Sequence, residues 1–256
     1  MEGVTFRAVY PQGSKFKKIF QPLTKIYEEM PFYITDEGLK IKSMSSDKNV
    51  LTIFDMPAIM FEEFDLTVDK LVIKVSPDEF GKVVKRATRD DAVVLEYERG
   101  SLFLTVKFVN KKTAVEREFK VRADEVPEEE EIEELNVDLT VTVKMSPKDL
   151  RYIVTDAKMI SDEVILETPN EESLIVRAMD VGKSYEAKLT MGNPLSTISV
   201  SSPATAKYSV DHLYDATRAY QAGEDLTLEY GTDLPLRIEM DVEGGAKLIM
   251  WIAPRA

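Results

Sequence analysis

Four segments of the chain carry apolar residues at the spacing of an amphipathic helix. The clearest lies within residues 74–96, where Ser76 and Pro77 precede the apolar pattern. This pair favours a helix start, because serine caps a first turn and proline is tolerated there. Three of the predicted apolar faces are Phe16, Ile19, Phe20 and Leu23; Phe80, Val83, Val84 and Ala87; and Leu213, Ala216, Thr217 and Tyr220.

The fourth segment, residues 144–167, resembles residues 74–96. Both read Lys, apolar, Ser-Pro, an apolar helix face and a short strand that ends in Leu-Glu. The first apolar positions of corresponding helices are 134 residues (150 minus 16) and 133 residues (213 minus 80) apart. This near-constant period indicates an internal duplication. Pro22 is expected to distort the first helix.

Between these helices the chain reads as strands and turns. The strand segments are rich in Val, Ile, Leu, Thr and Tyr, alternate partly with polar residues, and are separated by Gly, Asn, Asp or Pro. We therefore predict an α+β fold of two similar domains, each with antiparallel sheets covered on one face by helices. The predicted strands lie within 66–75, 101–109, 114–123, 139–145, 173–179, 184–191, 226–231, 235–241 and 246–253.

The predicted domains are residues 1–122 and 139–256, joined by a linker of residues 123–138. The linker is a cluster of glutamates with one proline, and such a segment buries too little surface to form a core element. Ile132 and Leu135 are its apolar exceptions. They either anchor the linker to the body of the protein or also border a docking site.

The composition of the chain excludes several classes of function. The 256 residues carry a formal net charge of -13, no cysteine and one histidine. Disulfides, thiol catalysis and cysteine-ligated metals are excluded, and one histidine leaves few ligands for a transition-metal site. The sequence begins without the apolar segment of a signal peptide and has no apolar run of membrane-spanning length, so a cytoplasmic protein is expected.

We find no catalytic constellation, and we expect no cofactor or metal. The glycine-rich phosphate-binding motifs are absent, and Gly244 and Gly245 read as a hairpin turn. The pair Asp90-Asp91 is typical of solvated acids, although such acids can hold Mg²⁺. His212 is expected to be a surface or capping residue.

Basic residues segregate onto the first two helices of this acidic chain. Lys82, Lys85, Arg86 and Arg89 lie at i, i+3, i+4 and i+7, opposite the apolar face. Lys18 and Lys25 lie opposite the apolar face of the first helix. The third helix has few cations at equivalent positions. The first half is therefore expected to supply most of any attraction to a polyanion.

These residues resemble the sliding clamps of archaea and eukaryotes, the proliferating cell nuclear antigen (PCNA) family. The resemblance runs over essentially the whole chain. Its carriers are GSKFKKIF, EGLKIKSMSSDKNVLT, SPDEFGKVVKRA, the acidic linker followed by VTVKMSP, and the final TDLPLRIEMDVEGGAKLIMWIAPR.

The resemblance implies a DNA clamp fold in which three subunits close head to tail into a ring around duplex DNA. The helices line the hole, and their cations would contact phosphates without reading sequence. Such a ring is a processivity factor and is not an enzyme. The DNA-facing residues that it implies are Lys17, Lys18, Lys25, Lys82, Lys85, Arg86, Arg89, Lys158 and Arg218.

Two further sites follow from the resemblance. A groove under the linker receives a short peptide with a glutamine and paired aromatics, from partners such as DNA polymerase, the clamp loader, flap endonuclease and DNA ligase. Its matching residues are Met44, Ile132, Leu135, Pro235, Trp251, Ala253 and Pro254. The subunit joint pairs the edge strands 114–122 and 184–190, with Val115, Arg117, Phe119, Tyr185, Ala187 and Leu189.

Some features depart from the family pattern. The linker is rich in glutamate where an aliphatic-proline segment is usual, and Trp251-Ile252 replaces Tyr-Leu, as in some subunits of heterotrimeric archaeal clamps. Homotrimer and heterotrimer with paralogous subunits both remain open, in an archaeal, nucleoid-associated setting. The alternatives of a different class are a Mg²⁺-dependent phosphoryl-transfer enzyme and an acidic protein-binding scaffold.

Overall fold

The structure is a computed structural model that describes residues 3–126, 132–219, 225–242 and 244–256. The chain divides into two compact units. Unit 1 comprises residues 1–43, 53–133 and 243–246, and unit 2 comprises residues 44–52, 134–242 and 247–256. Each unit therefore contains a short segment from the other half of the chain. None of the described helices is long and apolar enough to span a bilayer.

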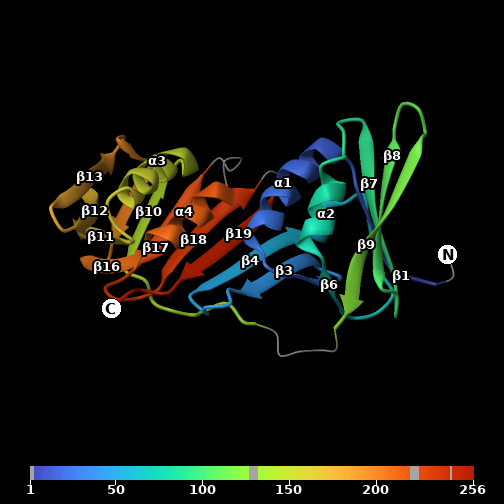
Figure 1. Ribbon diagram of the computed structural model, residues 1–256, viewed down its shortest axis with the longest axis horizontal. Coiled ribbons are helices and arrows are strands. Elements are labelled where there is room, and N and C mark those ends of the chain that lie inside the picture. Colours follow the sequence, from blue (N-terminus) through green and yellow to red (C-terminus); the bar gives the residue numbers. More distant parts are fainter. Residues whose placement is uncertain (1–2, 127–131, 220–224, 243) are drawn as a thin grey trace. The chain divides into compact units, whose positions relative to one another are not determined.

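The first half contains helices α1 and α2 within a series of strands (Figure 1). Its elements are β1 (Val4–Tyr10), α1 (Gly13–Ile26), β2 (Met30–Thr35), β3 (Gly38–Met44), β4 (Val50–Pro57), η1 (Ala58–Met60), β5 (Glu63–Leu66), β6 (Leu71–Val75), α2 (Pro77–Val84), β7 (Asp91–Glu98), β8 (Phe103–Asn110) and β9 (Glu116–Glu125).

The second half repeats this arrangement with α3 and α4. Its elements are β10 (Val141–Met145), α3 (Pro147–Lys158), β11 (Glu163–Asn170), β12 (Ser173–Asp180), β13 (Lys183–Met191), β14 (Pro194–Leu195), β15 (Thr197–Val200), β16 (Ala204–Ser209), α4 (Val210–Ala219), β17 (Leu226–Tyr230), β18 (Leu236–Val242) and β19 (Ala246–Ile252).

The sheet order shows the duplication directly. In the first half the strands run β5-β1-β7-β8-β9, and a second series runs β6-β2-β3-β4. In the second half the equivalent series are β15-β10-β17-β18-β19 and β16-β11-β12-β13. Apart from the short parallel pair β13–β14, the strand registers known for the described residues are antiparallel. The predicted α+β fold of two similar domains is confirmed.

Both serine-proline pairs begin helices, as predicted. The Ser76 hydroxyl accepts the backbone N–H of Glu79 at the start of α2, and the Ser146 hydroxyl accepts that of Lys148 at the start of α3. The helix α1 continues through Pro22 to Ile26. The turn at Gly244 and Gly245 has positive φ angles at both glycines, as a tight β18–β19 hairpin requires.

The core of unit 1 is a cluster of phenylalanine rings between its helices and its sheet. The ring of Phe80 on α2 lies 5.5 Å from that of Phe20 on α1 and 5.6 Å from that of Phe32 on β2. Gly81 allows the two helices to approach, because a Cβ there would lie 2.8 Å from the Thr24 hydroxyl. The apolar faces of α1 and α2 are thus buried, and their polar faces point away from the sheet.

The apolar side chains of unit 2 are arranged in the same way. Leu150, Val154 and Ala157 of α3 and Leu213 and Ala216 of α4 are buried. α3 and α4 lie side by side over the strands of their unit (Figure 1). Each pair of helices therefore covers one face of its own sheet.

The helix α2 is shorter than the basic pattern predicted, since it ends at Val84. Arg86 and Ala87 continue in a tighter turn whose N–H groups bond three residues back. The chain then reverses at Thr88, because its N–H and hydroxyl both donate to the Asp91 carboxylate at 2.7 Å. Arg89 consequently lies beyond the helix, in the turn that leads to β7.

Asp91 is a fully buried carboxylate, and its charge is compensated. The Arg117 guanidinium donates to its Oδ2 at 2.6 Å, in addition to the two bonds from Thr88. Although burial alone would raise it, these bonds hold the pKa of Asp91 below its ordinary value. A depressed folded-state pKa stabilises the fold above the unfolded pKa and loses that contribution as the pH falls through the folded value.

We expect Asp91→Asn to lower the free energy of unfolding at pH 7 by about 1–3 kcal/mol, because Arg117 loses its buried ionic partner. The difference from the wild type should shrink as the pH falls below about 4, because the unfolded carboxyl then binds a proton while the folded one, with its lowered pKa, still favours the charged form. Urea unfolding at several pH values measures both effects. The neighbouring Asp90 is exposed and pairs with Lys112, so Asp90→Asn is the control and should cost less than about 1 kcal/mol. Equal costs for the two variants would contradict a special role for Asp91.

Candidate nucleic-acid interface and peptide groove

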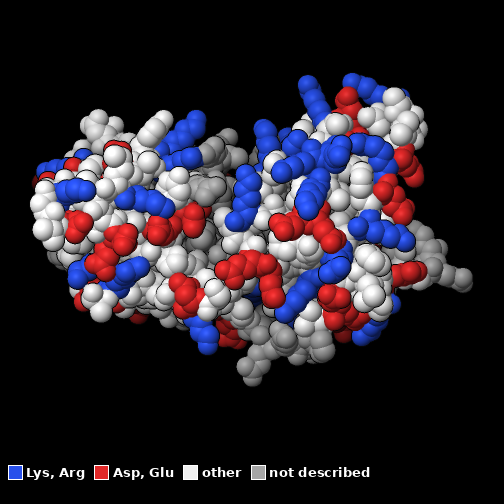
Figure 2. Space-filling model, viewed as in Figure 1, with Lys and Arg blue, Asp and Glu red and all other residues white. Residues whose placement is uncertain are grey.

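The cations of α1 and α2 lie on two helices that pack against each other. The Lys17 ammonium donates to the backbone carbonyl of Lys85 at 3.0 Å, so the C-terminal end of α2 lies against α1. In Figure 2 the blue side chains gather over the region of these helices. We call this set the cationic surface: Lys17, Lys18, Lys25, Lys82, Lys85, Arg86 and Arg89, of which all but Lys17 are exposed.

The second pair of helices offers much less positive charge. Lys158 on α3 forms an ion pair with Asp211 on α4 and lies 4.5 Å from the centre of the Tyr214 ring. Its bond to Asp211 raises the pKa of Lys158 and occupies its ammonium. Tyr152 and Met159, which take positions equivalent to cations of α2, are exposed. The side chain of Arg218 lies outside the described residues.

Most of the residues expected to form a peptide groove belong to unit 2. The backbone N–H of Ala253 donates to the carbonyl of Asn49 at 2.8 Å, so the C-terminal segment lies along the turn that follows Met44. Met44 and Leu135 are 40% and 44% exposed. Trp251, in contrast, is only 3% exposed. Two accessible apolar side chains thus flank this region, and the tryptophan is covered.

Both prolines of the expected groove flank strand β16. The carbonyl of Leu234, just before Pro235, accepts the Tyr208 hydroxyl at 2.7 Å. Arg255, just after Pro254, pairs its N–H with the carbonyl of Lys207. Pro235 and Pro254 are both half-buried. Ile132, which falls in unit 1, is also half-buried.

The edges expected at a subunit joint are open in the described part of the chain. Residues 116–122 of β9 pair with β8 on one side; on the other side Arg122 bonds Ser76 and Glu79, and pairing with β6 begins at Ala123. On β13, pairing with β14 starts at Thr190. The remaining edge of each strand has backbone N–H and C=O groups without a partner strand among the described residues. Such an edge is a template for pairing with another chain.

Side chains on these edges alternate between the helix side and the outer side. On β9, Arg117 lies over the Phe108 ring at 5.1 Å, and the Phe119 ring packs against the same residue at 5.6 Å. On β13, Tyr185 and Ala187 are half-buried and Leu189 is buried. Burial, and to a lesser degree the Asp156 charge, raises the pKa of Tyr185. Val115, just before β9, is exposed.

Comparisons with known proteins decide the family. The model described as "Proliferating cell nuclear antigen, N-terminal domain" matches residues 5–132, and the corresponding C-terminal domain matches residues 131–255. The chain belongs to the PCNA family. The two matches meet at the linker and together cover nearly all of the sequence.

Relatives of this PCNA-family chain agree over their full length. A protein named "DNA polymerase sliding clamp" from Thermofilum pendens is 28% identical over 96% of this chain and 98% of its own. A "DNA polymerase sliding clamp 2" from Sulfurisphaera tokodaii is 27% identical over 97% of this chain and 99% of its own. The crystal structure of PCNA from Thermococcus kodakaraensis has a TM-score of 0.87 at 24% identity, covering 98% of this chain and all of that one. This last likeness supports the PCNA fold.

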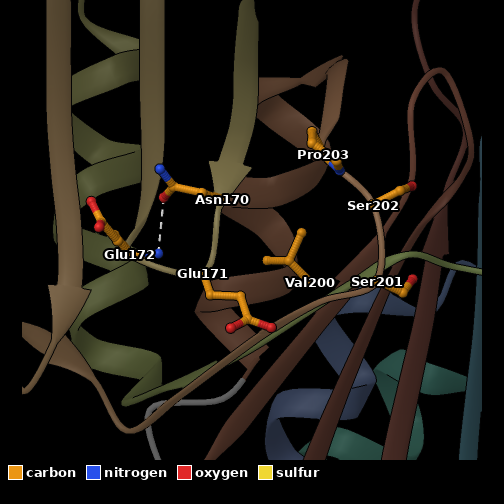
Figure 3. A pocket seen from close by; sticks show the side chains of 7 residues that line it. All are labelled: Asn170, Glu171, Glu172, Val200, Ser201, Ser202 and Pro203. Atoms are coloured by element: carbon orange, nitrogen blue, oxygen red, sulfur yellow. Dashed lines mark hydrogen bonds between the residues drawn. The ribbon is translucent and has the colours of Figure 1, made fainter.

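A shallow pocket of about 430 Å³ lies on unit 2, between the β11–β12 turn and the segment before β16. In Figure 3 the carboxylates of Glu171 and Glu172 point in different directions, and the Ser201 and Ser202 hydroxyls point away from them. These side chains do not converge on a point, so the pocket has the geometry of neither a metal site nor an acid–base pair. Among the residues that the structure describes, no group of three or more His, Asp or Glu is placed to hold a metal ion.

Sequence reasoning missed the polar contacts that organise the groove region. His212 lies 3.3 Å from Asp47, in the turn after Met44, and the Ser45 hydroxyl and Asn49 hold the pKa of Asp47 well below its usual range. On the outer face of unit 2, Glu134 accepts hydrogen bonds from Arg237 and Trp251. His212 and Asp47, and Glu134 and its two donors, are more than 100 residues apart in the sequence, so no local pattern indicates these contacts.

Proposed function

We propose that this chain is a subunit of a DNA polymerase sliding clamp, a ring that encircles duplex DNA and tethers replication and repair enzymes to it. The observation that carries the proposal is the full-length match to the PCNA family. The duplicated sheet order and the names of the relatives support it. The two alternatives, a Mg²⁺-dependent phosphoryl-transfer enzyme and an acidic scaffold, find no support. The subunit itself catalyses no reaction, and it works in the compartment that holds chromosomal DNA.

The cationic surface is the part that contacts DNA in this proposal. Exposed ammonium and guanidinium groups neutralise phosphates without reading bases, which suits a protein that moves along any sequence. Arg218 and Lys158 belong to the proposed set, but Lys158 contributes less because Asp211 already neutralises its charge. The net charge of -13 repels DNA from the rest of the protein.

Ring closure is proposed to join the free edge of β9 to the free edge of β13 in the next subunit. Backbone pairing extends both sheets across the joint, and the helix-side residues Arg117, Phe119, Tyr185, Ala187 and Leu189, with Val115 just before β9, pack beside it. The neighbouring subunit is another copy of this chain or a paralogous subunit.

The groove at Met44, Leu135, Pro235, Ala253 and Pro254 is proposed to take a short peptide with a glutamine and paired aromatics. Accessible apolar side chains with a polar rim suit aromatic anchors. DNA polymerase, the clamp loader, flap endonuclease and DNA ligase are the proposed carriers of such peptides. Trp251 and Ile132 complete the set of residues proposed for this groove.

Topological binding is the property that separates a clamp from an ordinary DNA-binding protein. The assembled ring, loaded by a clamp loader and ATP onto a closed circular plasmid, should remain bound through gel filtration at high salt. Cutting the plasmid once should release most of the protein, because a linear end lets the ring slide off.

A blocked end provides the control. Biotin and streptavidin at both ends of the linear DNA should restore retention without changing the protein. Equal retention on open linear and circular DNA would overturn the proposal, because direct phosphate contacts alone do not depend on DNA ends.

A further inference from the structure

One glutamate of the linker makes the contacts that tie this segment to the sheet of unit 2. The Oε1 atom of Glu134 accepts the Arg237 Nε–H at 3.1 Å and the Trp251 indole N–H at 3.3 Å. The two donors come from the neighbouring strands β18 and β19. A single carboxylate oxygen therefore joins the linker to two strands at once.

Arg237, which binds Glu134, is also held by residues of the sheet itself. The Arg237 guanidinium also bonds Glu229 at 2.7 Å and Glu239 at 2.5 Å, and its centre lies 5.8 Å from the middle of the Trp251 ring. The Arg237 side chain is 18% exposed. Two carboxylates of the sheet, Glu229 and Glu239, and the Trp251 ring hold the guanidinium, so its Nε–H remains directed at Glu134.

The rest of the linker has no comparable hold. Among residues 132–138, as the structure describes them, Glu133, Glu134, Leu135, Asn136 and Asp138 are exposed. Glu134 is the residue of this stretch whose side chain is shown hydrogen-bonded to the sheet. Without this contact, an acidic segment with so little apolar burial would sample many conformations.

We propose that Glu134 is a positioning residue for the peptide groove: by binding Arg237 and Trp251 it fixes the linker, and so holds Leu135 where a partner peptide meets it. This inference rests on the proposed function. Leu135 directly follows Glu134 and is 44% exposed, so it is available to a ligand while its backbone is fixed. Because the linker is already ordered, peptide binding does not include the entropic cost of ordering it.

The free protein offers a direct reporter of this contact, because Trp251 is the only tryptophan of the chain. Glu134→Ala removes the acceptor of the indole N–H and uncovers the ring. We expect its fluorescence emission to shift to longer wavelength and acrylamide quenching to increase. Glu134→Gln keeps an acceptor oxygen and should restore much of the wild-type spectrum. Glu133→Gln, which removes the same charge one residue away, should leave the spectrum unchanged.

The consequence for binding is measured by calorimetric titration with a synthetic peptide that contains a glutamine and two aromatics but no tryptophan. Glu134→Ala should raise the dissociation constant about five- to tenfold, a modest value because the contact is partly exposed. Glu133→Gln should stay within about twofold.

The two readouts separate the possible failures. Unchanged Trp251 emission in Glu134→Ala would overturn the contact itself, whatever the peptide does. Shifted emission with equal or tighter peptide binding would overturn the positioning role. A wild-type protein that binds no such peptide, while the emission still responds, would overturn the proposed groove and with it the role of Glu134 in recognition.

Discussion

Replacing Lys82, Lys85 and Arg86 together by alanine is expected to weaken DNA binding by about ten- to a hundredfold at low salt. Each phosphate contact that is lost lowers the slope of log affinity against log salt by about 0.9, so the triple variant should lose about 3 from the slope if all three contact phosphates. These side chains are exposed, so the fold should be unaffected. Fluorescence anisotropy with a short duplex at several salt concentrations measures both quantities.

The opposite face of the same sheet supplies a matched control. Lys40, Lys42 and Lys74 alternate with the buried residues of β3 and β6, so they lie on the side of the sheet away from α1 and α2. Their triple alanine variant removes the same charge from the same unit. It should keep nearly the wild-type slope. An equal loss in both variants would mean that DNA responds to net charge alone, and the cationic surface would have no special role.

Phe80→Ala is expected to be the most destabilising single change discussed, at about 3–5 kcal/mol of unfolding free energy. Phe80 is fully buried, and its ring meets those of Phe16, Phe20 and Phe32 at centroid distances of 6.3, 5.5 and 5.6 Å. Its removal leaves a cavity between α2, α1 and the sheet. The unfolding free energy of a domain of ordinary size is only about 5–15 kcal/mol, so unit 1 should approach unfolding at room temperature.

Urea unfolding followed by circular dichroism measures this loss. Phe103 on β8 is the control, since it is exposed and the same substitution there deletes the same atoms. Phe103→Ala should cost less than about 1 kcal/mol. If the two variants were equally stable, the ring cluster would not be the core that holds α2 against α1.

The fold was predictable because its signals are local. Apolar spacing placed the four α-helices of the described residues, and the serine-proline pairs marked two of their starts, since capping depends on neighbouring residues. The repeat of these signals predicted two similar domains. The end of α2 was missed, because it depends on Thr88 meeting the buried Asp91 and on Asp91 meeting Arg117 from another strand.

The candidate sites were predictable only in outline. The sequence shows where the cations are but not which of them are paired. Lys158 was expected to face DNA, and in the structure it forms an ion pair with Asp211 of α4. The linker was expected to be exposed, and Glu134 and the residues on both sides of it are exposed. The contact of Glu134 with Trp251, across 117 residues, has no signature in either segment. Polar partners in three dimensions, rather than residue types, decide which charges remain free.

Each unit contains a segment from the other half of the chain, and this limits how the protein can be divided into fragments. Unit 2 includes residues 44–52, whose Asn49 carbonyl receives the Ala253 N–H and whose Asp47 lies against His212. Unit 1 in turn includes residues 244–246, where a Cβ at Gly244 would lie 3.0 Å from the Met60 methyl. A fragment that ends or begins at the linker would thus lack a piece of its own structure. The duplication that shaped this sequence produced two halves that are no longer separable modules.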